Sequence, residues 1–302
     1  MARESHRVTT LAALIEAARP RQWTKNGLLF VGLLFALRLM DTLALARAGT
    51  AFVAFCAISS AGYIFNDLAD LDQDRLHPRK RRRPLASGRL PRGLAIGFGV
   101  LLLAIGVGLA FTLSRAFGAL AVGYVTLSVA YNLGLKRVVL VDLFTLASFF
   151  VIRTVAGAVA IDVPISPWLY LCTILAALFL GLAKRRHELL LLGDSAGGHR
   201  QILREYTPQL LEQLITIVTA SLIMAYSLYT FSAENLPRDH TMMVTIPIVI
   251  FGIFRYLYLV HLRDGGGAPE DLLLSDRPLI VTVVLLLVGA VAVLYTHIPG
   301  AA

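Results

Sequence analysis

Four oxygen-bearing side chains recur at helical spacing in the stretch FNDLADLDQD, which begins at Phe65. At about 100° per residue they fall within an arc of roughly 100° on one helix face, and Asp72 points to the other side. The four residues are Asn66, Asp67, Asp70 and Asp74. Carboxylates this close repel one another unless a cation lies among them, and ligands that are all oxygen suit Mg²⁺, which completes its shell with water and substrate phosphates. The spacing therefore predicts a magnesium site on this face.

Two other interpretations of these acidic residues can be tested against the sequence. A calcium-binding EF-hand loop that began at Asp70 would need Gly at its sixth position and Glu at its twelfth, where the chain has Arg75 and Arg81. That loop is excluded. A solvated acidic face, neutralised by the basic run at residues 79–83, remains an alternative.

The elements that position these residues are expected to be transmembrane helices. Of the 302 residues, 57% are hydrophobic and 16% are charged, against about 25% charged in a typical soluble protein. Apolar stretches of roughly 18 residues or more recur along the chain, which is typical of helices that cross a bilayer. The sequence predicts an all-α, polytopic integral membrane bundle of nine transmembrane helices, with residues 1–302 as one domain. The expected spans are 27–46, 48–65, 93–113, 117–135, 138–160, 164–183, 211–231, 241–260 and 279–297.

The distribution of basic residues predicts the orientation of this bundle. If the N-terminus is cytoplasmic and nine spans alternate, 22 Lys and Arg lie in cytoplasmic segments and only Arg47, Arg115 and Arg238 lie in outer ones. The positive-inside rule favours this topology, with the acidic face at the cytoplasmic end of the second span. Residues 1–25 contain apolar side chains at helical spacing among arginines, which predicts a helix in the membrane interface. The basic balance then requires no nucleic acid as a partner.

The pattern N-D-x-x-D-x-x-x-D after an apolar span resembles the first acidic motif of the UbiA superfamily of intramembrane transferases. The resemblance implies nine helices and a Mg²⁺ bound by Asn66, Asp67, Asp70 and Asp74 and bridged to a diphosphate. Two further segments are similar to the family. The segment ARPRQWTKNGLL implies substrate-binding roles for Lys25 and Asn26, and YNLGLKR implies them for Tyr131, Lys136 and Arg137. An aromatic belt followed by a positive-inside anchor is the alternative for the second segment.

The expected fifth span carries two charged residues, Asp142 and Arg153. Eleven residues of helix separate them by about 16 Å, so they are not expected to form an ion pair. A charge deep in a span normally faces a watery cavity or a partner group. Arg153 is therefore a candidate phosphate contact, with a structural pairing to another helix as the alternative.

The segment AKRRHELLLLGDSAGGHR departs from the family, whose members that use prenyl diphosphates usually have a second Asp-x-x-x-Asp motif there. Glu188 and Asp194 are the acids available, which leaves open whether a second Mg²⁺ binds through one of them. The cations are Lys184, Arg185 and Arg186. Together with RPRQWTKN, this segment resembles a polyprenyl-phosphate phosphoribosyltransferase branch of the family. In that branch, 5-phosphoribose passes from 5-phosphoribosyl 1-diphosphate (PRPP) to a polyprenyl (decaprenyl) phosphate for cell-wall arabinan synthesis.

This resemblance implies roles for the candidate residues. Asp67, Asp70 and Asp74 would be catalytic because Mg²⁺ at them stabilises the leaving diphosphate, and Lys184, Arg185, Arg186 and Glu188 would bind substrate. The enzyme would act from the cytoplasmic side of the plasma membrane, and the sequence leaves a homo-oligomer open. Prenyl transfer to a small or aromatic acceptor is the nearest alternative activity. A cation-coupled transporter is another, although transporters usually place their ions near the bilayer midplane.

Overall fold

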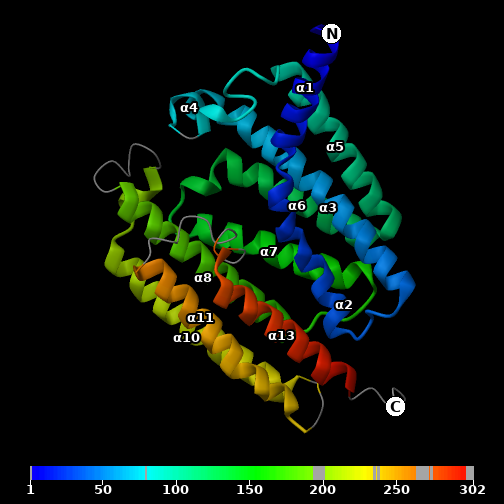
Figure 1. Ribbon diagram of the computed structural model, residues 1–302, viewed down its shortest axis with the longest axis vertical. Helices are drawn as coiled ribbons and strands as arrows, with labels where there is room; N and C mark the ends of the chain where they lie inside the picture. The colour runs from blue at the N-terminus through cyan, green and yellow to red at the C-terminus, as the bar shows by residue number, and fades with distance from the viewer. Residues whose placement is uncertain are drawn as a thin grey trace. The chain divides into compact units, whose positions relative to one another are not determined.

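The computed structural model describes residues 2–78, 80–192, 201–233, 236, 239–262, 272 and 275–296. Across these ranges the regular structure is helical throughout, without a strand, and eight helical segments are long and apolar enough to cross a membrane (Figure 1). They are α3 (Thr42–Ala69), α5 (Arg92–Leu113), α6 (Arg115–Leu133), α7 (Val141–Ala160), α8 (Pro167–Leu192), α10 (Pro208–Ser232), α11 (Ile246–Leu262) extended by the 3₁₀ helix η6 (Thr241–Thr245), and α13 (Arg277–Thr296). The all-α prediction and eight of the nine expected spans are confirmed.

The first expected span, 27–46, is the one that is not confirmed as a helix. Its place is taken by the 3₁₀ helix η1 (Pro20–Phe30), the short helix α2 (Val31–Phe35) and a turn. Leu37 has a positive φ of 57°, which reverses the chain. Asp41 then caps the start of α3, because its Oδ1 accepts hydrogen bonds of 3.0 Å from the backbone N–H groups of Leu43 and Ala44.

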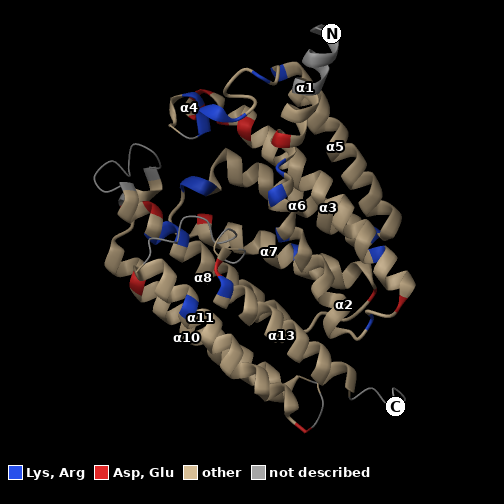
Figure 2. Ribbon diagram, in the orientation of Figure 1, with Lys and Arg blue, Asp and Glu red and all other residues tan. Residues whose placement is uncertain are grey.

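The chain packs as two compact units. Unit 1 comprises Met1–Leu33, Leu39–Leu133 and Ile152–Val163, and unit 2 comprises Leu34–Arg38, Gly134–Val151 and Pro164–Ala302. Lys and Arg are few along the spanning helices and gather toward their ends (Figure 2). Because the chain packs as two units, a single domain over 1–302 stays a prediction.

In unit 1, α3 packs along α5, α5 packs on α6, and η1 lies against α3. The approach of η1 to the C-terminal half of α7 is close enough to require glycine, because a Cβ on Gly157 would run into the carbonyl group of Leu29. The helix α1 (Ala2–Ala18) packs on α3 through Ala13 and Ala17, which are buried, whereas Leu11 and Ile15 on its other side are exposed. Unit 1 thus fixes η1 and the end of α3 as neighbours.

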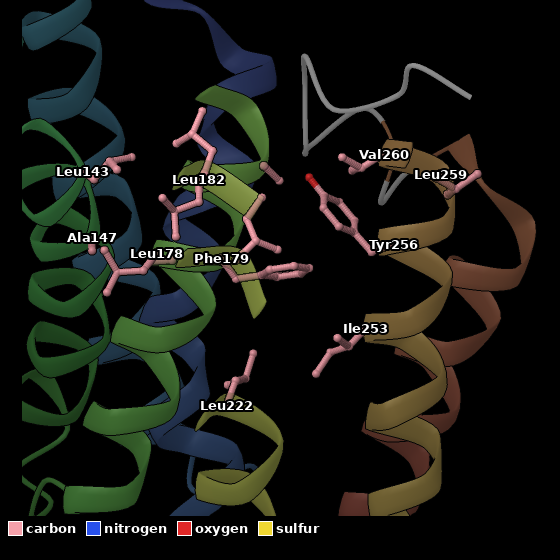
Figure 3. Packing of buried hydrophobic residues seen from close by; sticks show 14 of the residues in the cluster. Leu143, Ala147, Leu178, Phe179, Leu182, Leu222, Ile253, Tyr256, Leu259 and Val260 are labelled. Atoms are coloured by element: carbon pink, nitrogen blue, oxygen red, sulfur yellow. The ribbon is translucent and has the colours of Figure 1, made fainter. Parts of the chain in front are cut away.

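In unit 2, α8 packs against α10, and α11 packs against α13. Figure 3 shows the apolar core of this unit, in which Leu143 of α7 and Leu182 of α8 belong to the same buried cluster. The rings of Phe179 and Tyr256 meet edge to face with centroids 5.2 Å apart. This core holds the charged end of α8 against the start of α7.

Candidate active site

The predicted acidic face lies where α3 ends. The helix stops at Ala69, Asp70 adopts φ −95° and ψ 10°, and the short helix α4 (Leu71–Leu76) follows. The backbone N–H of Asp70 still donates to the carbonyl of Asn66 at 2.9 Å, and that of Asp74 donates to Asp70 at 2.8 Å. Because this i to i−4 pattern continues across the turn, the acidic side chains keep their helical spacing.

Burial separates these side chains as the helical argument predicted. Asp67 is 3% exposed and Asp74 is 1% exposed, whereas the side chain of Asp72 is 89% exposed. Asn66 and Asp70 are half-buried. The prediction that Asp72 points away from the others is confirmed, and the acidic face at Asp67 and Asp74 is not a solvated one.

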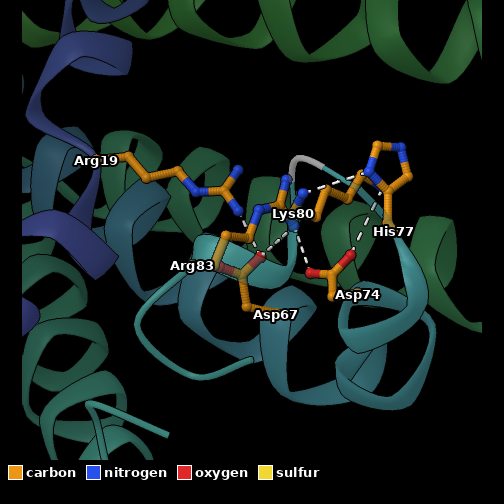
Figure 4. A network of polar contacts seen from close by, with 6 residues as sticks. All are labelled: Arg19, Asp67, Asp74, His77, Lys80 and Arg83. Atoms are coloured by element: carbon orange, nitrogen blue, oxygen red, sulfur yellow. Dashed lines mark hydrogen bonds and ion pairs between the residues drawn. The ribbon is translucent and has the colours of Figure 1, made fainter. Parts of the chain in front are cut away.

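Basic side chains neutralise the two buried carboxylates (Figure 4). Arg83 Nη1 lies 3.0 Å from Asp67 Oδ1 and 2.6 Å from Asp74 Oδ2, so one nitrogen contacts both groups. Arg19 Nη2 also donates to Asp67 Oδ1, and Lys80 Nζ lies 3.6 Å from Asp74 Oδ1. These three basic residues were not predicted as site residues. The signal was present, because Arg83 and Lys80 belong to the basic run and Arg19 to the segment ARPRQWTKN.

The oxygen donors at this place fit a hard divalent cation. Among the residues that the structure describes, no three His, Cys, Asp or Glu side chains form a group that could hold a metal ion. The carboxylates that do meet are the pair Asp67 and Asp74, which Arg83 bridges. One or two carboxylates are the usual protein contribution to Mg²⁺, with water and substrate phosphates as the other ligands. A metal at this pair would take the place of the bridging guanidinium nitrogen.

The segment η1 is anchored beside α3 by polar contacts. Trp23 Nε1 donates to Ser60 Oγ at 3.0 Å, and Ser60 Oγ donates to the carbonyl of Ala18 at 2.8 Å. Arg19 precedes η1 with φ 52° and ψ 62°, and its guanidinium lies 5.0 Å from the ring centroid of Tyr63. A left-handed conformation is uncommon for a residue other than glycine, so these contacts stabilise an unfavourable backbone geometry at the site.

Arg153 lies in a buried polar cluster of unit 1. Its Nε donates to Asn26 Oδ1 at 2.7 Å and its Nη2 donates to the hydroxyl of Tyr124 at 2.6 Å. Asn26 is fully buried and donates in turn to Ser59 Oγ at 3.3 Å. The structure thus shows Arg153 paired with side chains of other elements, which is the alternative that the sequence left open. It places Lys25 half-buried next to this cluster along η1.

A second buried charge cluster lies in unit 2. Arg185 Nε donates to Asp142 Oδ2 at 3.0 Å, and Arg185 Nη1 lies 2.7 Å from Glu188 Oε2. The hydroxyl of Tyr206 donates to Asp142 Oδ1 at 3.3 Å and accepts from the backbone N–H of Leu140 at 2.9 Å. The charged partner that the structure gives Asp142 is therefore Arg185 on another helix. Tyr206 was missed, because nothing in its local sequence marks it.

The other predicted substrate-binding residues are more accessible. Arg186 pairs with Glu212 on α10 at 2.9 Å, and Lys184 is half-buried on α8. Tyr131 is half-buried at the end of α6 in unit 1. Lys136 and Arg137 lie in the 3₁₀ helix η3 (Leu135–Arg137) of unit 2. Asp194 lies outside the described residues.

Comparison with known proteins identifies the class of this fold. Residues 27–275 match the model of the UbiA prenyltransferase family. The decaprenyl-phosphate phosphoribosyltransferase of Corynebacterium glutamicum is 35% identical over 271 residues, which cover 88% of this chain and 82% of the relative. The protein of the same name from Mycobacterium tuberculosis is 34% identical over 275 residues, covering 89% and 90%. A solved UbiA homologue from Archaeoglobus fulgidus, bound to GPP and Mg²⁺, superimposes with a TM-score of 0.72 at 18% identity, over 94% of this chain and 99% of that one.

The chain therefore belongs to the UbiA prenyltransferase family. It is a multi-pass membrane protein and a transferase, as the acidic motif and the apolar spans predicted.

Proposed function

We propose that this protein transfers 5-phosphoribose from PRPP to a polyprenyl phosphate and releases diphosphate. The proposed acceptor is decaprenyl phosphate. The reaction would take place at the cytoplasmic face of the plasma membrane and supply a lipid-linked precursor of cell-wall arabinan. The names of the relatives that align over almost the whole chain support this choice of substrates.

The observation that carries the proposal is the buried pair Asp67 and Asp74 among Arg19, Lys80 and Arg83. Carboxylates can hold a divalent metal, and guanidinium groups match phosphate oxygens with short, charge-assisted hydrogen bonds. Buried carboxylates beside partly exposed basic side chains suit a diphosphate that arrives with its metal. Mg²⁺ bound there would act as a Lewis acid that neutralises the leaving diphosphate.

The residues of the chain would act chiefly by positioning. The acceptor is a phosphate monoester, which is already largely anionic at pH 7 and needs no strong general base. The bond from ribose C1 to the diphosphate breaks as a phosphate oxygen of the acceptor bonds to C1, and the diphosphate leaves with the bonding electrons. Asn66 and Asp70, half-buried on the same face as Asp67 and Asp74, complete the proposed metal-binding set.

Recognition of the donor must involve more than the acidic face. PRPP carries a 5-phosphate that a prenyl diphosphate lacks, and a diphosphate site alone cannot distinguish the two donors. We propose that Lys184 and Arg186 on α8 contribute to binding the 5-phosphate, and that Lys25, Tyr131, Lys136 and Arg137 contribute to binding the donor or the acceptor phosphate. In this proposal Arg153, Arg185 and Glu188 act from within their buried clusters, by holding neighbouring groups in place.

The experiment uses purified protein in lipid nanodiscs with radiolabelled PRPP, decaprenyl phosphate and Mg²⁺. The expected result is label in the extracted lipid together with an equal amount of released diphosphate. The controls are the Asp67→Asn variant, which should lose most of the product, and chelation with EDTA, which should abolish it. The alternative prenyltransferase activity would be favoured if label passed from a prenyl diphosphate to a small aromatic acceptor and no label passed from PRPP to lipid.

A further inference from the structure

Asp67 and Asp74 each have two basic partners, and they share one of them. Arg83 Nη1 contacts both carboxylates at 3.0 and 2.6 Å, Arg19 donates to Asp67, and Lys80 Nζ lies 3.6 Å from Asp74. Of these three basic groups, Arg83 is the one that both buried carboxylates share. Because both carboxylates are at most 3% exposed, water screens these interactions less than it would at the surface.

Arg83 is presented to the carboxylates by a fixed segment of backbone. The N–H of Arg83 donates to the carbonyl of Lys80 at 2.9 Å, and Leu85 and Leu90 anchor the following residues in the core of unit 1. Arg89 ties the segment to α1, because its guanidinium makes hydrogen bonds of 2.7 and 3.0 Å to the two carboxylate oxygens of Glu16. These bonds raise the pKa of Arg89 above its usual value. With the backbone held in this way, release of Arg83 requires only rotation of its own side chain.

A free divalent cation has two obstacles at this pair of carboxylates. It must displace the nitrogen of Arg83 from both oxygens, and it adds two positive charges where basic groups already neutralise both buried carboxylates. A diphosphate removes the second obstacle, because its own negative charges balance the metal and the released guanidinium.

We propose that Arg83 is an internal counter-cation. It holds Asp67 and Asp74 together and keeps them from binding free Mg²⁺, so that the metal enters together with a diphosphate. The inference rests on the metal-binding part of the proposed function, but it does not depend on which diphosphate donor the enzyme uses.

The test is the binding of Mn²⁺ alone to the purified full-length protein, measured by electron paramagnetic resonance without any donor. Arg83→Gln should bind Mn²⁺ about tenfold more tightly than the parent, which corresponds to about 1.4 kcal/mol. Arg81→Gln is the matched control, since it removes the same charge from an exposed position in the same basic run and should leave the affinity unchanged. Equal affinities of the parent and Arg83→Gln would overturn the proposal.

The role of diphosphate is tested in the same samples. After correction for Mn²⁺ bound by diphosphate in solution, inorganic diphosphate should raise the Mn²⁺ affinity of the parent by about tenfold or more, and that of Arg83→Gln by clearly less. The same enhancement in both proteins would contradict a gate at Arg83. Because PRPP and the lipid acceptor are absent, this result is independent of whether the protein makes a phosphoribosyl lipid.

A third measurement needs no variant, in case Arg83→Gln does not fold. The parent protein is treated with the arginine reagent phenylglyoxal, and modified arginines are mapped by mass spectrometry. Saturating Mn²⁺ should increase the modification of Arg83 severalfold and leave that of Arg81 unchanged. Modification of Arg83 that does not respond to Mn²⁺ would show that the metal and the guanidinium do not exchange.

Discussion

Arg185 and Asp142 form a buried ion pair, with Nε of the arginine 3.0 Å from Oδ2 of the aspartate and both residues at most 1% exposed. The two residues lie on different helices of unit 2, α8 and α7. Two charges inside a membrane protein are costly unless they are paired and hydrogen-bonded. The pair therefore explains how an arginine and an aspartate are both tolerated near the ends of apolar helices, and it gives Arg185 a structural role.

The first prediction concerns the loss of one partner of this pair. Asp142→Asn should lower the stability of the protein by about 3 kcal/mol, the lower end of the range for a broken buried pair, because Glu188 still lies 2.7 Å from Nη1 of the buried guanidinium. Thermal unfolding in detergent measures the effect. Glu212→Gln is the control, since Glu212 pairs with Arg186 while half exposed to solvent, and such pairs contribute about 0 to 1 kcal/mol. Equal shifts in the two variants would contradict this role of the buried pair.

The second prediction concerns alkaline pH. Burial raises the pKa of Tyr206 above the usual value of 10.0, and the charge of Asp142 raises it further. Below pH 10 the hydroxyl is protonated in both the folded and the unfolded chain. As the pH rises above 10, only the unfolded chain loses the proton, so the folded state loses stability. Unfolding curves at pH 8 to 11 should therefore show a steeper loss for the parent than for Tyr206→Phe. Parallel curves would show that Tyr206 does not contribute to this pH dependence.

The acidic site shows how much the sequence could predict. Helical spacing alone placed Asp67 and Asp74 on one face and Asp72 on another, because an α-helix fixes the angle between residues. The structure confirms this separation. The partners of the carboxylates could not be predicted in the same way. Arg19 is 48 residues from Asp67 along the chain, and only the packing of α1 and η1 on α3 brings them together.

The first expected span shows the limit of hydropathy. The segment 27–46 is apolar enough to suggest a single helix, but composition does not report a reversal of the backbone. The positive φ of Leu37 and the capping of α3 by Asp41 divide the segment. In the same way, Arg153 was a candidate phosphate contact because a lone charge in a span suggests function. Its partners Asn26 and Tyr124 come from distant parts of the chain.

The third prediction tests the metal-binding residues by removal of single charges. Asp67→Asn, Asp70→Asn and Asp74→Asn should each leave a folded protein and remove most of the turnover, because diphosphate departure loses its Mg²⁺ support. Asp72→Asn should retain most of the activity, since its side chain is 89% exposed and points away from Asp67 and Asp74. The measurement is the rate of diphosphate release at saturating Mg²⁺. If Asp72→Asn lost as much activity as Asp74→Asn, the helical-face interpretation would be refuted.

The fourth prediction concerns topology, which rests on the division of 22 against three Lys and Arg between the two sides. In a background that lacks Cys56 and Cys172, a cysteine at Ser232 or Ala301 should react with an impermeant thiol reagent added to intact cells. A cysteine at Ser195 should react only after the cells are opened. Ser232 ends α10, and the other two positions lie outside the described residues. Labelling with the opposite pattern would reverse the proposed orientation.

The last prediction separates donor recognition from structure on α8. Lys184 and Arg185 are adjacent, but Lys184 is half-buried whereas Arg185 is 1% exposed and pairs with Asp142 and Glu188. A charge-assisted hydrogen bond to phosphate contributes about 1.5 to 3 kcal/mol. If Lys184 binds the 5-phosphate, Lys184→Ala should therefore lower kcat/KM for PRPP by about tenfold to a hundredfold.

Ribose 1-diphosphate, which lacks the 5-phosphate, is the matched donor for this test. It should be a poor substrate for the parent, and Lys184→Ala should lose little further activity with it. Arg185→Ala should instead lower the stability and reduce activity with both donors by similar factors, because it leaves two carboxylates without their buried partner. If Lys184→Ala reduced both donors equally, Lys184 would be a positive-inside anchor or a contact to the diphosphate. If Arg185→Ala were stable and lost activity with PRPP only, the result would show that the guanidinium leaves its carboxylate partners to bind the donor.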